Sequence, residues 1–319
     1  MTKRFLALTL AMVMLLSLGG CGAKKAANLV MATGGTSGTY FALGGAMAGQ
    51  VNSYLKDSGV KITATSTGAS KENIRNIAAG EADLALVQND VLDYASKGIE
   101  LFDGEKTANL SVVATLYPEV VQIVVGKNSG INSIADLKGK KVSVGDVGSG
   151  VEANAKQILE AYGLTFDDVN ASHLSFKESA NGFKDKQLDA FFVTAGVPNT
   201  AVVELSVTDP VKVLEIDAEH RAALIKKYPF YGEFTVTKDV YNTDADATTL
   251  AVMATLIARK DLDEKVVYDI TKALFAHLDE LGNAHAKGKE LSAEKAISSI
   301  SIDMHAGAAK YFKEIGVLK

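Results

Sequence analysis

One local pattern recurs along the sequence. A short run of aliphatic residues leads into a loop rich in glycine, serine and threonine, and an amphipathic helical stretch follows. Strands and helices that alternate in this way are typical of an α/β protein with a mostly parallel sheet. The sequence therefore predicts the α/β class, with strands at residues 29–32, 61–65, 83–87 and 141–144 and helices at residues 41–55, 69–79 and 151–162.

A proline interrupts the most apolar part of the chain. Residues 111–116 and 120–125 each have the composition of a buried strand, and Tyr117 and Pro118 lie between them. Because proline cannot donate a hydrogen bond to a neighbouring strand, we predict that the two runs belong to different sheets. The chain is expected to cross between two domains for the first time at this point.

The later part of the chain predicts a return to the first domain. Residues 211–216 are expected to lead back into it, and the chain from about residue 248 is expected to be largely helical, with a long helix over residues 263–282. A length of 319 residues agrees with two domains of roughly 150 residues each. We predict domain 1 at residues 28–117 plus 207–319 and domain 2 at residues 118–206, with a hinge around Tyr117 and Ser206.

The composition excludes several classes of site. Cys21 is the single cysteine, so an intrachain disulfide, a cysteine-cluster zinc site and an iron–sulfur cluster are excluded. The net charge is −5 and no dense run of lysine and arginine occurs. Nucleic-acid binding proteins usually carry a basic stripe, so we expect no nucleic acid as a partner.

The N-terminal segment has the features of a secretion signal. Residues 1–20 begin with Lys3 and Arg4, continue as an apolar run and end in two glycines before Cys21. Residues 18–21 resemble the lipobox of bacterial lipoproteins, in which the cysteine carries the lipid. We therefore predict a signal peptide, lipid attachment at Cys21, a tether over residues 21–27 and an extracytoplasmic, membrane-anchored protein. A soluble secreted protein whose cleavage merely falls near a cysteine is the alternative.

Four polar loops follow predicted strands, at residues 33–40, 66–70, 87–90 and 145–150. In open α/β sheets, ligands bind beyond the carboxyl ends of the strands, and a helix N-terminus is a ready receptor for a carboxylate or phosphate. Each loop has a simpler interpretation as well. Thr36, Ser70, Asp90 and Ser149 could be helix caps. Four such loops in register with strands favour a binding site.

Catalytic machinery is poorly represented. Residues 148–153 match a dinucleotide-binding motif only formally, because the acidic residues near the expected spacing fall in a turn. The five histidines lack the paired spacing of metal ligands, and no nucleophile motif occurs. We expect binding without chemistry, with no catalytic residue, metal or cofactor.

Ten segments resemble the TAXI family, the solute-binding proteins of TRAP transporters. They are residues 31–40, 66–70, 80–90, 116–119, 134–140, 148–150, 193–198, 227–231, 270–275 and 307–311. The resemblance implies a type II periplasmic-binding-protein fold, in which two α/β lobes joined by crossing strands close over one small ligand. It also implies a carboxylate ligand such as glutamate, glutamine or 2-oxoglutarate, and a TRAP membrane subunit as partner.

The resemblance and the loops together give a set of candidate ligand-binding residues. The hydroxyls of Thr36, Thr67 and Ser149 are expected to donate to the ligand, while Gln88 and Asp90 could engage an amino group. Val151 stands where the family often has a hydroxyl residue, and residues 235–237 differ from the family pattern. The full predicted set is Thr36, Ser37, Tyr40, Thr67, Ser70, Gln88, Asp90, Tyr117, Ser149, Gly150 and Val151.

Two other functional classes share the implied fold. One is the binding component of an ATP-driven importer or a ligand-sensing module, which the genes flanking this one would distinguish. The other is an enzyme such as an aromatic-ring-building deaminase. That chemistry needs a cofactor-bearing cysteine inside the fold, which this sequence lacks.

Overall fold

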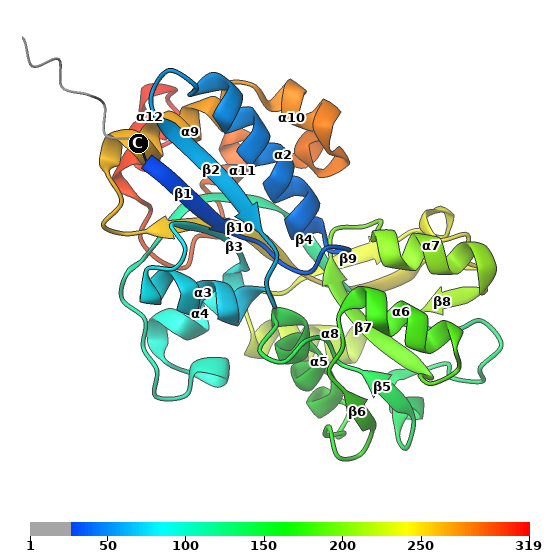
Figure 1. Cartoon of the computed structure of the whole chain (residues 1–319). Coiled ribbons are helices and arrows are strands. Elements are labelled where there is room, and N and C mark those ends of the chain that lie inside the picture. Colours follow the sequence, from blue (N-terminus) through cyan, green and yellow to red (C-terminus); the bar gives the residue numbers. More distant parts are fainter. Residues whose placement is uncertain (1–26) are drawn as a thin grey trace, which may run out of the picture.

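The computed structural model describes residues 27–319. They form two α/β lobes that share a continuous sheet of ten strands, with helices on both faces (Figure 1). The predicted α/β class and two-lobed architecture are confirmed. The signal peptide, the lipid attachment at Cys21 and the tether up to residue 26 lie outside the described residues.

Lobe 1 is built from the two ends of the described chain, drawn in blue, cyan, orange and red in Figure 1. The termini meet because the C-terminal helices pack on α2 and the first strands. Two hydrophobic clusters, one on each face of its sheet, form its core. Its elements are β1 (Ala27–Ala32), α2 (Thr39–Tyr54), β2 (Val60–Thr65), α3 (Ser70–Ala79), β3 (Leu84–Gln88), α4 (Asn89–Lys97), η1 (Glu100–Phe102), α9 (Glu264–Phe275), α10 (Leu278–Ala284), η4 (Ala286–Glu290), α11 (Ala293–Ala296) and α12 (Ala306–Glu314).

Lobe 2 is built from the middle of the chain, drawn in green and yellow. Two further hydrophobic clusters form its core. Its elements are η2 (Ile134–Leu137), β5 (Lys141–Ser143), α5 (Gly150–Ala161), β6 (Asn170–Ser172), α6 (Phe176–Lys184), β7 (Ala190–Ala195), α7 (Thr200–Thr208), β8 (Val211–Val213), α8 (Ala218–Lys227), β9 (Gly232–Val236) and η3 (Lys238–Val240).

Two long strands, β4 (Leu110–Gly126) and β10 (Ala247–Arg259), run antiparallel to each other through both lobes. The strand order is β2-β1-β3-β10-β4-β7-β5-β6, with β8 on β4 and β9 on β10. In β4, the residues up to Tyr117 belong to the lobe 1 core and those from Val120 belong to the lobe 2 cores. The two strands therefore form the connection between the lobes.

The prediction that Pro118 divides two sheets is wrong, because β4 continues through it. Pro118 lies opposite Met253, where the register between β4 and β10 shifts. The N–H of Met253 donates instead to the side-chain oxygen of Asn89 at 3.0 Å. The ladder is thus already irregular at the one place where proline has no N–H to give.

The prediction of a largely helical chain after residue 248 is also wrong over β10. This segment is buried at nearly every position because neighbouring strands and both core layers cover it. A central strand buried on both faces lacks the alternation that distinguishes a strand from a buried helix. The long helix expected over residues 263–282 is divided into α9 and α10, which are separated at Ala276 and His277.

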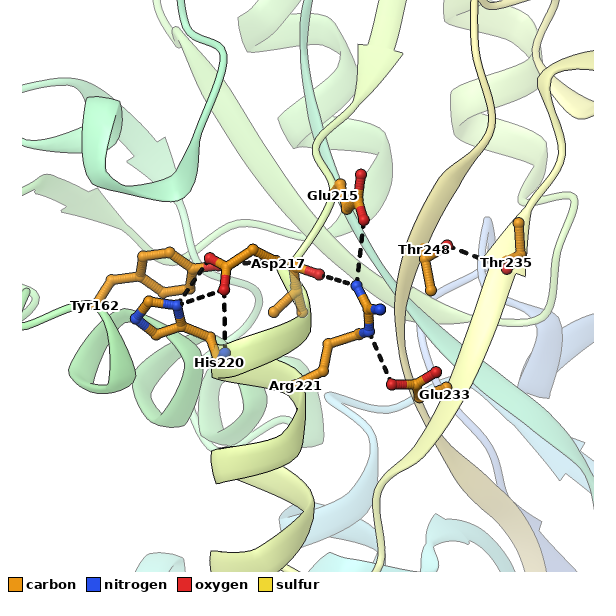
Figure 2. A network of polar contacts seen from close by, with 9 residues as sticks. Tyr162, Glu215, Asp217, His220, Arg221, Glu233, Thr235 and Thr248 are labelled. Carbon is orange, nitrogen blue, oxygen red and sulfur yellow. Dashed lines mark hydrogen bonds and ion pairs between the residues drawn. The ribbon is translucent and has the colours of Figure 1, made fainter.

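Residues 211–236 pack in lobe 2, not in lobe 1 as expected. β8 pairs with the far end of β4, and Leu214 and Leu224 belong to a lobe 2 core. Figure 2 shows how Arg221 of α8 holds this unit together. Its guanidinium donates to Glu233 of β9 at 3.0 Å, to Glu215 at 3.2 Å and to the backbone carbonyl of Ile216. We therefore propose that the return crossing lies in β10, close to the first crossing, rather than near Ser206.

Candidate functional site

A small cavity of about 50 Å³ lies between the lobes. Both lobes contribute to its wall, and β4 passes beside it at the crossing. The volume restricts the occupant of this closed form to a small molecule. The residues that line this interlobe cavity are Gly34, Gly35, Ser37, Gly38, Thr39, Tyr40, Ala69, Ser70, Gln88, Glu119, Asp146, Ser149, Gly150, Val151, Ser175, Phe176, Thr194 and Ala195.

Four helix N-termini meet at the interlobe cavity. In lobe 1, α2 and α3 begin without any side-chain cap, since Gly38 and Ala69 occupy their N-cap positions. In lobe 2, α5 and α6 begin with serine caps: Ser149 accepts from the N–H of Glu152 at 3.1 Å, and Ser175 caps α6 in the same way. The first backbone N–H groups of α2 and α3, other than that of Lys71, which donates to the carbonyl of Gly148, can therefore bind an anion, and the helix dipoles favour one there.

The simpler interpretation as helix caps holds for Ser149 alone among the residues proposed. Thr36 is exposed in the loop before α2, and Gly38 takes the cap position. The hydroxyl of Ser70 accepts a hydrogen bond from the N–H of Gln88 at 3.1 Å and so ties α3 to the end of β3. Asp90 was expected as a cap, but Gln88 occupies the N-cap position of α4 and Asp90 lies in the first turn of that helix.

The structure brings part of the predicted set together. Seven of the predicted residues line the interlobe cavity: Ser37, Tyr40, Ser70, Gln88, Ser149, Gly150 and Val151. The other four lie outside its lining. Thr36 is exposed in the loop before α2, and the Thr67 hydroxyl donates to the side-chain oxygen of Asn73 in α3 at 2.6 Å. Asp90 and Tyr117 are fully buried behind the cavity wall.

Eleven lining residues are absent from the predicted set, and four of them have side chains of particular interest: Glu119, Asp146, Phe176 and Thr194. Three of them carried a recognisable signal. Glu119 is the only charged residue in the apolar run 110–126, Asp146 lies in a glycine-rich loop, and Thr194 is a polar residue near the end of a buried strand. Phe176 begins α6 and gave no signal, because an aromatic residue there usually belongs to a core.

The most unusual group in the cavity is the Glu119 carboxyl. It is 2% exposed and accepts a hydrogen bond from the Tyr40 hydroxyl. Burial raises the pKa of Glu119 to about 8; the hydrogen bond from Tyr40 opposes this rise, and the nearby Asp90 adds to it. Burial also raises the pKa of the Tyr40 hydroxyl, so Tyr40 remains a neutral donor. Around neutral pH, Glu119 is therefore protonated in a large fraction of molecules.

Two buried polar atoms of residues in the cavity wall have no hydrogen-bond partner among residues 27–319. They are Oε1 of Gln88 and Oγ1 of Thr194. Buried polar atoms are paired in most proteins, because an unmade hydrogen bond is costly. Both atoms belong to residues that line the cavity, so a bound ligand is the natural partner for them.

The lobes are closed onto each other in this structure. The N–H of Lys71 in α3 donates to the carbonyl of Gly148 at 3.2 Å. The α5 backbone at Gly150 lies against the side chain of Gln88; a Cβ atom at this position would come within 2.1 Å of Oε1. Lobe 2 therefore approaches the end of β3 at Gly150 too closely to leave room for a side chain.

A buried polar network also joins the lobes behind the cavity. Asn154 of α5 donates to Asp90 of α4 at 3.0 Å and to the Tyr231 hydroxyl at 2.9 Å. Tyr231 donates to Gln157 at 2.7 Å, and Gln157 donates to Tyr94 of α4 at 3.0 Å. Burial raises the pKa of Asp90 to about 6. We call these five residues the interlobe network.

The two departures from the family pattern lie in different places. Val151 lines the cavity at the start of α5, and its side chain packs against Gly145. Residues 235–237 lie at and beyond the end of β9 and do not line the cavity. The first departure changes the cavity wall and the second does not.

This architecture defines the class of the protein: it has the type II fold of periplasmic solute-binding proteins. Residues 31–316 match the NMT1-like family, and the chain belongs to that family. Among residues 27–319, no helix is both long and apolar enough to cross a bilayer, and no group of three or more His, Cys, Asp and Glu side chains is arranged to hold a metal ion.

Three solved structures illustrate the likeness in fold. The periplasmic aliphatic sulphonate binding protein SsuA from Escherichia coli is 17% identical with a TM-score of 0.51, over 92% of this chain and 80% of that one. The alkanesulfonate-binding protein SsuA from Xanthomonas axonopodis pv. citri, bound to MOPS, is 15% identical with a TM-score of 0.50, over 93% and 82%. The ligand-binding component of an ABC-type import system from Staphylococcus aureus, with zinc bound, is 12% identical with a TM-score of 0.50, over 81% and 78%. All three are described as binding proteins.

Proposed function

We propose that this protein is an extracytoplasmic solute-binding protein. It captures a small carboxylate between its lobes and delivers it to a membrane transporter. The observation that carries this proposal is the meeting of four helix N-termini from two lobes at one cavity. The similarity in fold to periplasmic binding proteins supports it.

The geometry suggests how the ligand is held. A carboxylate fits the uncapped N-termini of α2 and α3, where backbone N–H groups and the helix dipoles face the cavity. Lobe 2 then covers the ligand with the start of α5 and with Phe176. Closure is favoured to the extent that the ligand binds the closed form more tightly than the open form.

The finer parts of the proposal come from the sequence. The resemblance to the TAXI family implies delivery to a TRAP membrane subunit and a ligand such as glutamate, glutamine or 2-oxoglutarate. The lipobox-like segment implies anchoring through Cys21. The second candidate is the binding component of an ATP-driven importer, which the fold of the Staphylococcus aureus import component favours. A TRAP permease gene beside this one supports the first candidate, and an ATPase gene supports the second.

A thermal-shift screen with amino acids and dicarboxylic acids tests the function. A ligand at 100 times its Kd adds about 2.7 kcal/mol to the free energy of unfolding. Calorimetry on the hits should show at least a tenfold loss of affinity for Gln88→Ala, which removes a buried group from the cavity wall. Gln187→Ala, at an exposed position far from the cavity, is the control. A hit that binds both variants like the wild type would show that it binds elsewhere.

A further inference from the structure

We propose that the interlobe cavity selects a ligand that carries an ammonium group, and that Glu119 is the residue that receives this group. The inference rests on the proposed function and narrows it. A zwitterionic amino acid would bind, and the 2-oxo acid with the same skeleton would be rejected.

The charges of the cavity wall give the first argument. None of the residues that line the cavity is lysine, arginine or histidine, whereas Glu119 and Asp146 are both acidic. The helix N-termini of α2 and α3 supply partial positive charge for one carboxylate. A dianion would leave its second charge beside two carboxyl groups with no cation to pair with it. A zwitterion brings its own cation.

The hydrogen-bonding groups give the second argument. An ammonium group has three donors and no acceptor. The wall offers the Glu119 carboxyl and two buried oxygens without partners, Oε1 of Gln88 and Oγ1 of Thr194. Thr194 of β7 pairs with Val121 of β4, two residues from Glu119, so Glu119 and Thr194 lie on the same face of adjacent strands. Gln88 lies at the end of β3, and its Oε1 atom is the third acceptor.

Within the described residues 27–319, the charged neighbours of Glu119 include no unpaired cation that could take this role. Tyr40 of α2 donates to the carboxyl, and Asp90 of α4 and Tyr117 of β4 also lie near it. Lys287 of η4 is the nearby cation, but its Nζ atom pairs with Glu290 at 2.6 Å. Asp146 faces the same cavity from lobe 2. The positive charge that would ionise Glu119 fully must therefore come with the ligand.

This arrangement couples binding to proton release. With the lobes closed, burial raises the pKa of Glu119 to about 8, so its carboxyl is protonated in most molecules at pH 6.5. An ammonium group in contact with the carboxyl favours the ionised form and lowers that pKa. The ligand's own amino group is already charged at this pH. Binding should then release close to one proton per ligand.

Matched ligand pairs test the selectivity. We suggest L-glutamate with 2-oxoglutarate, L-alanine with pyruvate, and L-leucine with 4-methyl-2-oxopentanoate, measured by isothermal titration calorimetry. At least one amino acid should bind, with an affinity at least thirtyfold above that of its 2-oxo partner. If a 2-oxo acid binds as tightly as its partner, the inference is wrong and the proposed function stands. If no amino or carboxylic acid of either series binds, both are wrong.

The same titrations at pH 6.5 in buffers of different ionisation enthalpy measure the proton release. Glu119→Gln should lower the affinity for the amino acid at least thirtyfold and abolish the release. Glu81→Gln, at an exposed position of lobe 1, should change neither. If Glu119→Gln fails to fold, the wild-type measurement decides alone: release near one proton supports the inference, and no release or an uptake overturns it.

Discussion

Helix N-termini form both walls of the cavity, but only the helices of lobe 2 begin with a side-chain cap. The lobe 1 helices α2 and α3 have Gly38 and Ala69 as N-cap residues, so no side chain caps them, and their first N–H groups other than that of Lys71 stay open. The lobe 2 helices α5 and α6 begin at Ser149 and Ser175, whose side chains already satisfy an N–H group of their own helix. The difference suggests that lobe 1 holds the ligand's carboxylate and that lobe 2 mainly covers it.

The largest expected effect concerns the carboxyl groups of the two walls and the pH dependence of stability. Because the pKa of Glu119 is about 8 in the folded protein and near 4.5 when unfolded, the folded state keeps a proton that the unfolded chain releases. The free energy of unfolding should therefore fall by a few kcal/mol as the pH rises from about 5 to about 8. Urea unfolding at several pH values measures this fall.

Two variants test which carboxyl group causes the fall in the free energy of unfolding. Glu119→Gln should flatten the pH dependence, since it removes the buried carboxyl. Asp146→Asn, on the lobe 2 wall, should flatten it much less, because Asp146 is only half-buried. Equal slopes for the wild type and Glu119→Gln would contradict the buried, protonated state of Glu119.

The next largest effect should come from the contact between the walls at Gly150. Gly150→Ala places a Cβ atom within 2.1 Å of the Gln88 side chain, so either Gln88 leaves the cavity wall or the lobes stay apart. We expect the ligand affinity to fall at least thirtyfold, as measured by calorimetry. The thermal stability of the unliganded protein should change little, because the position is at a helix start with an ordinary backbone conformation.

Gly45→Ala is the matched control for this substitution. Gly45 lies in α2 with open space at its Cβ position, and alanine favours a helix there. The control should keep full affinity. A Gly150→Ala variant with unchanged affinity would show that the closed form tolerates a wider gap than this structure has.

A moderate effect is expected from the interlobe network. Asn154→Leu preserves the side-chain volume but leaves Asp90 and Tyr231 without their partner in the closed form. In the open form, water can satisfy both groups, so the substitution penalises closure. Ligand release in stopped-flow measurements should become about tenfold faster. Lys156→Ala, on the exposed face of the same helix, should leave the rate unchanged; equal rates for both variants would rule out a role in closure.

The smallest effect tests the asymmetry of the walls directly. Ser149→Ala removes the cap of α5 and should lower the free energy of unfolding by about 1 kcal/mol. If lobe 2 mainly covers the ligand, the affinity should fall by less than about threefold. Thr36→Ala, at an exposed position, should alter neither quantity. A tenfold loss for Ser149→Ala would instead make the lobe 2 wall an equal partner in binding.

The sequence predicts the local elements of lobe 1 well and its long-range pairing poorly. The strands and helices up to residue 88 lie within two residues of their predicted places, and Gly80 ends α3 in the left-handed conformation as expected. β10 was missed because a strand buried on both faces has no alternating pattern. The continuity of β4 through Pro118 depends on Met253 and Asn89, which are distant in sequence.

In the candidate site, too, local features could be predicted from the sequence and tertiary contacts could not. Residues such as Ser37 and Ser149 could be identified because they stand in glycine-rich loops that directly follow strands, at the edge of the sheet where ligands bind. Glu119 could not be placed, because its role depends on the tertiary contact with Tyr40 and on complete burial. Thr67 was predicted for the ligand but bonds to Asn73, a partner that composition does not reveal.

The shared strands β4 and β10 bear on how the molecule folds. Each contributes residues to the cores of both lobes, so neither core is complete until both strands are in place. Lobe 1 in addition needs the last helices of the chain against its first strands. Despite the two-lobed shape, the chain should behave as one cooperative unit, with a single unfolding transition and no stable fragment that corresponds to either lobe.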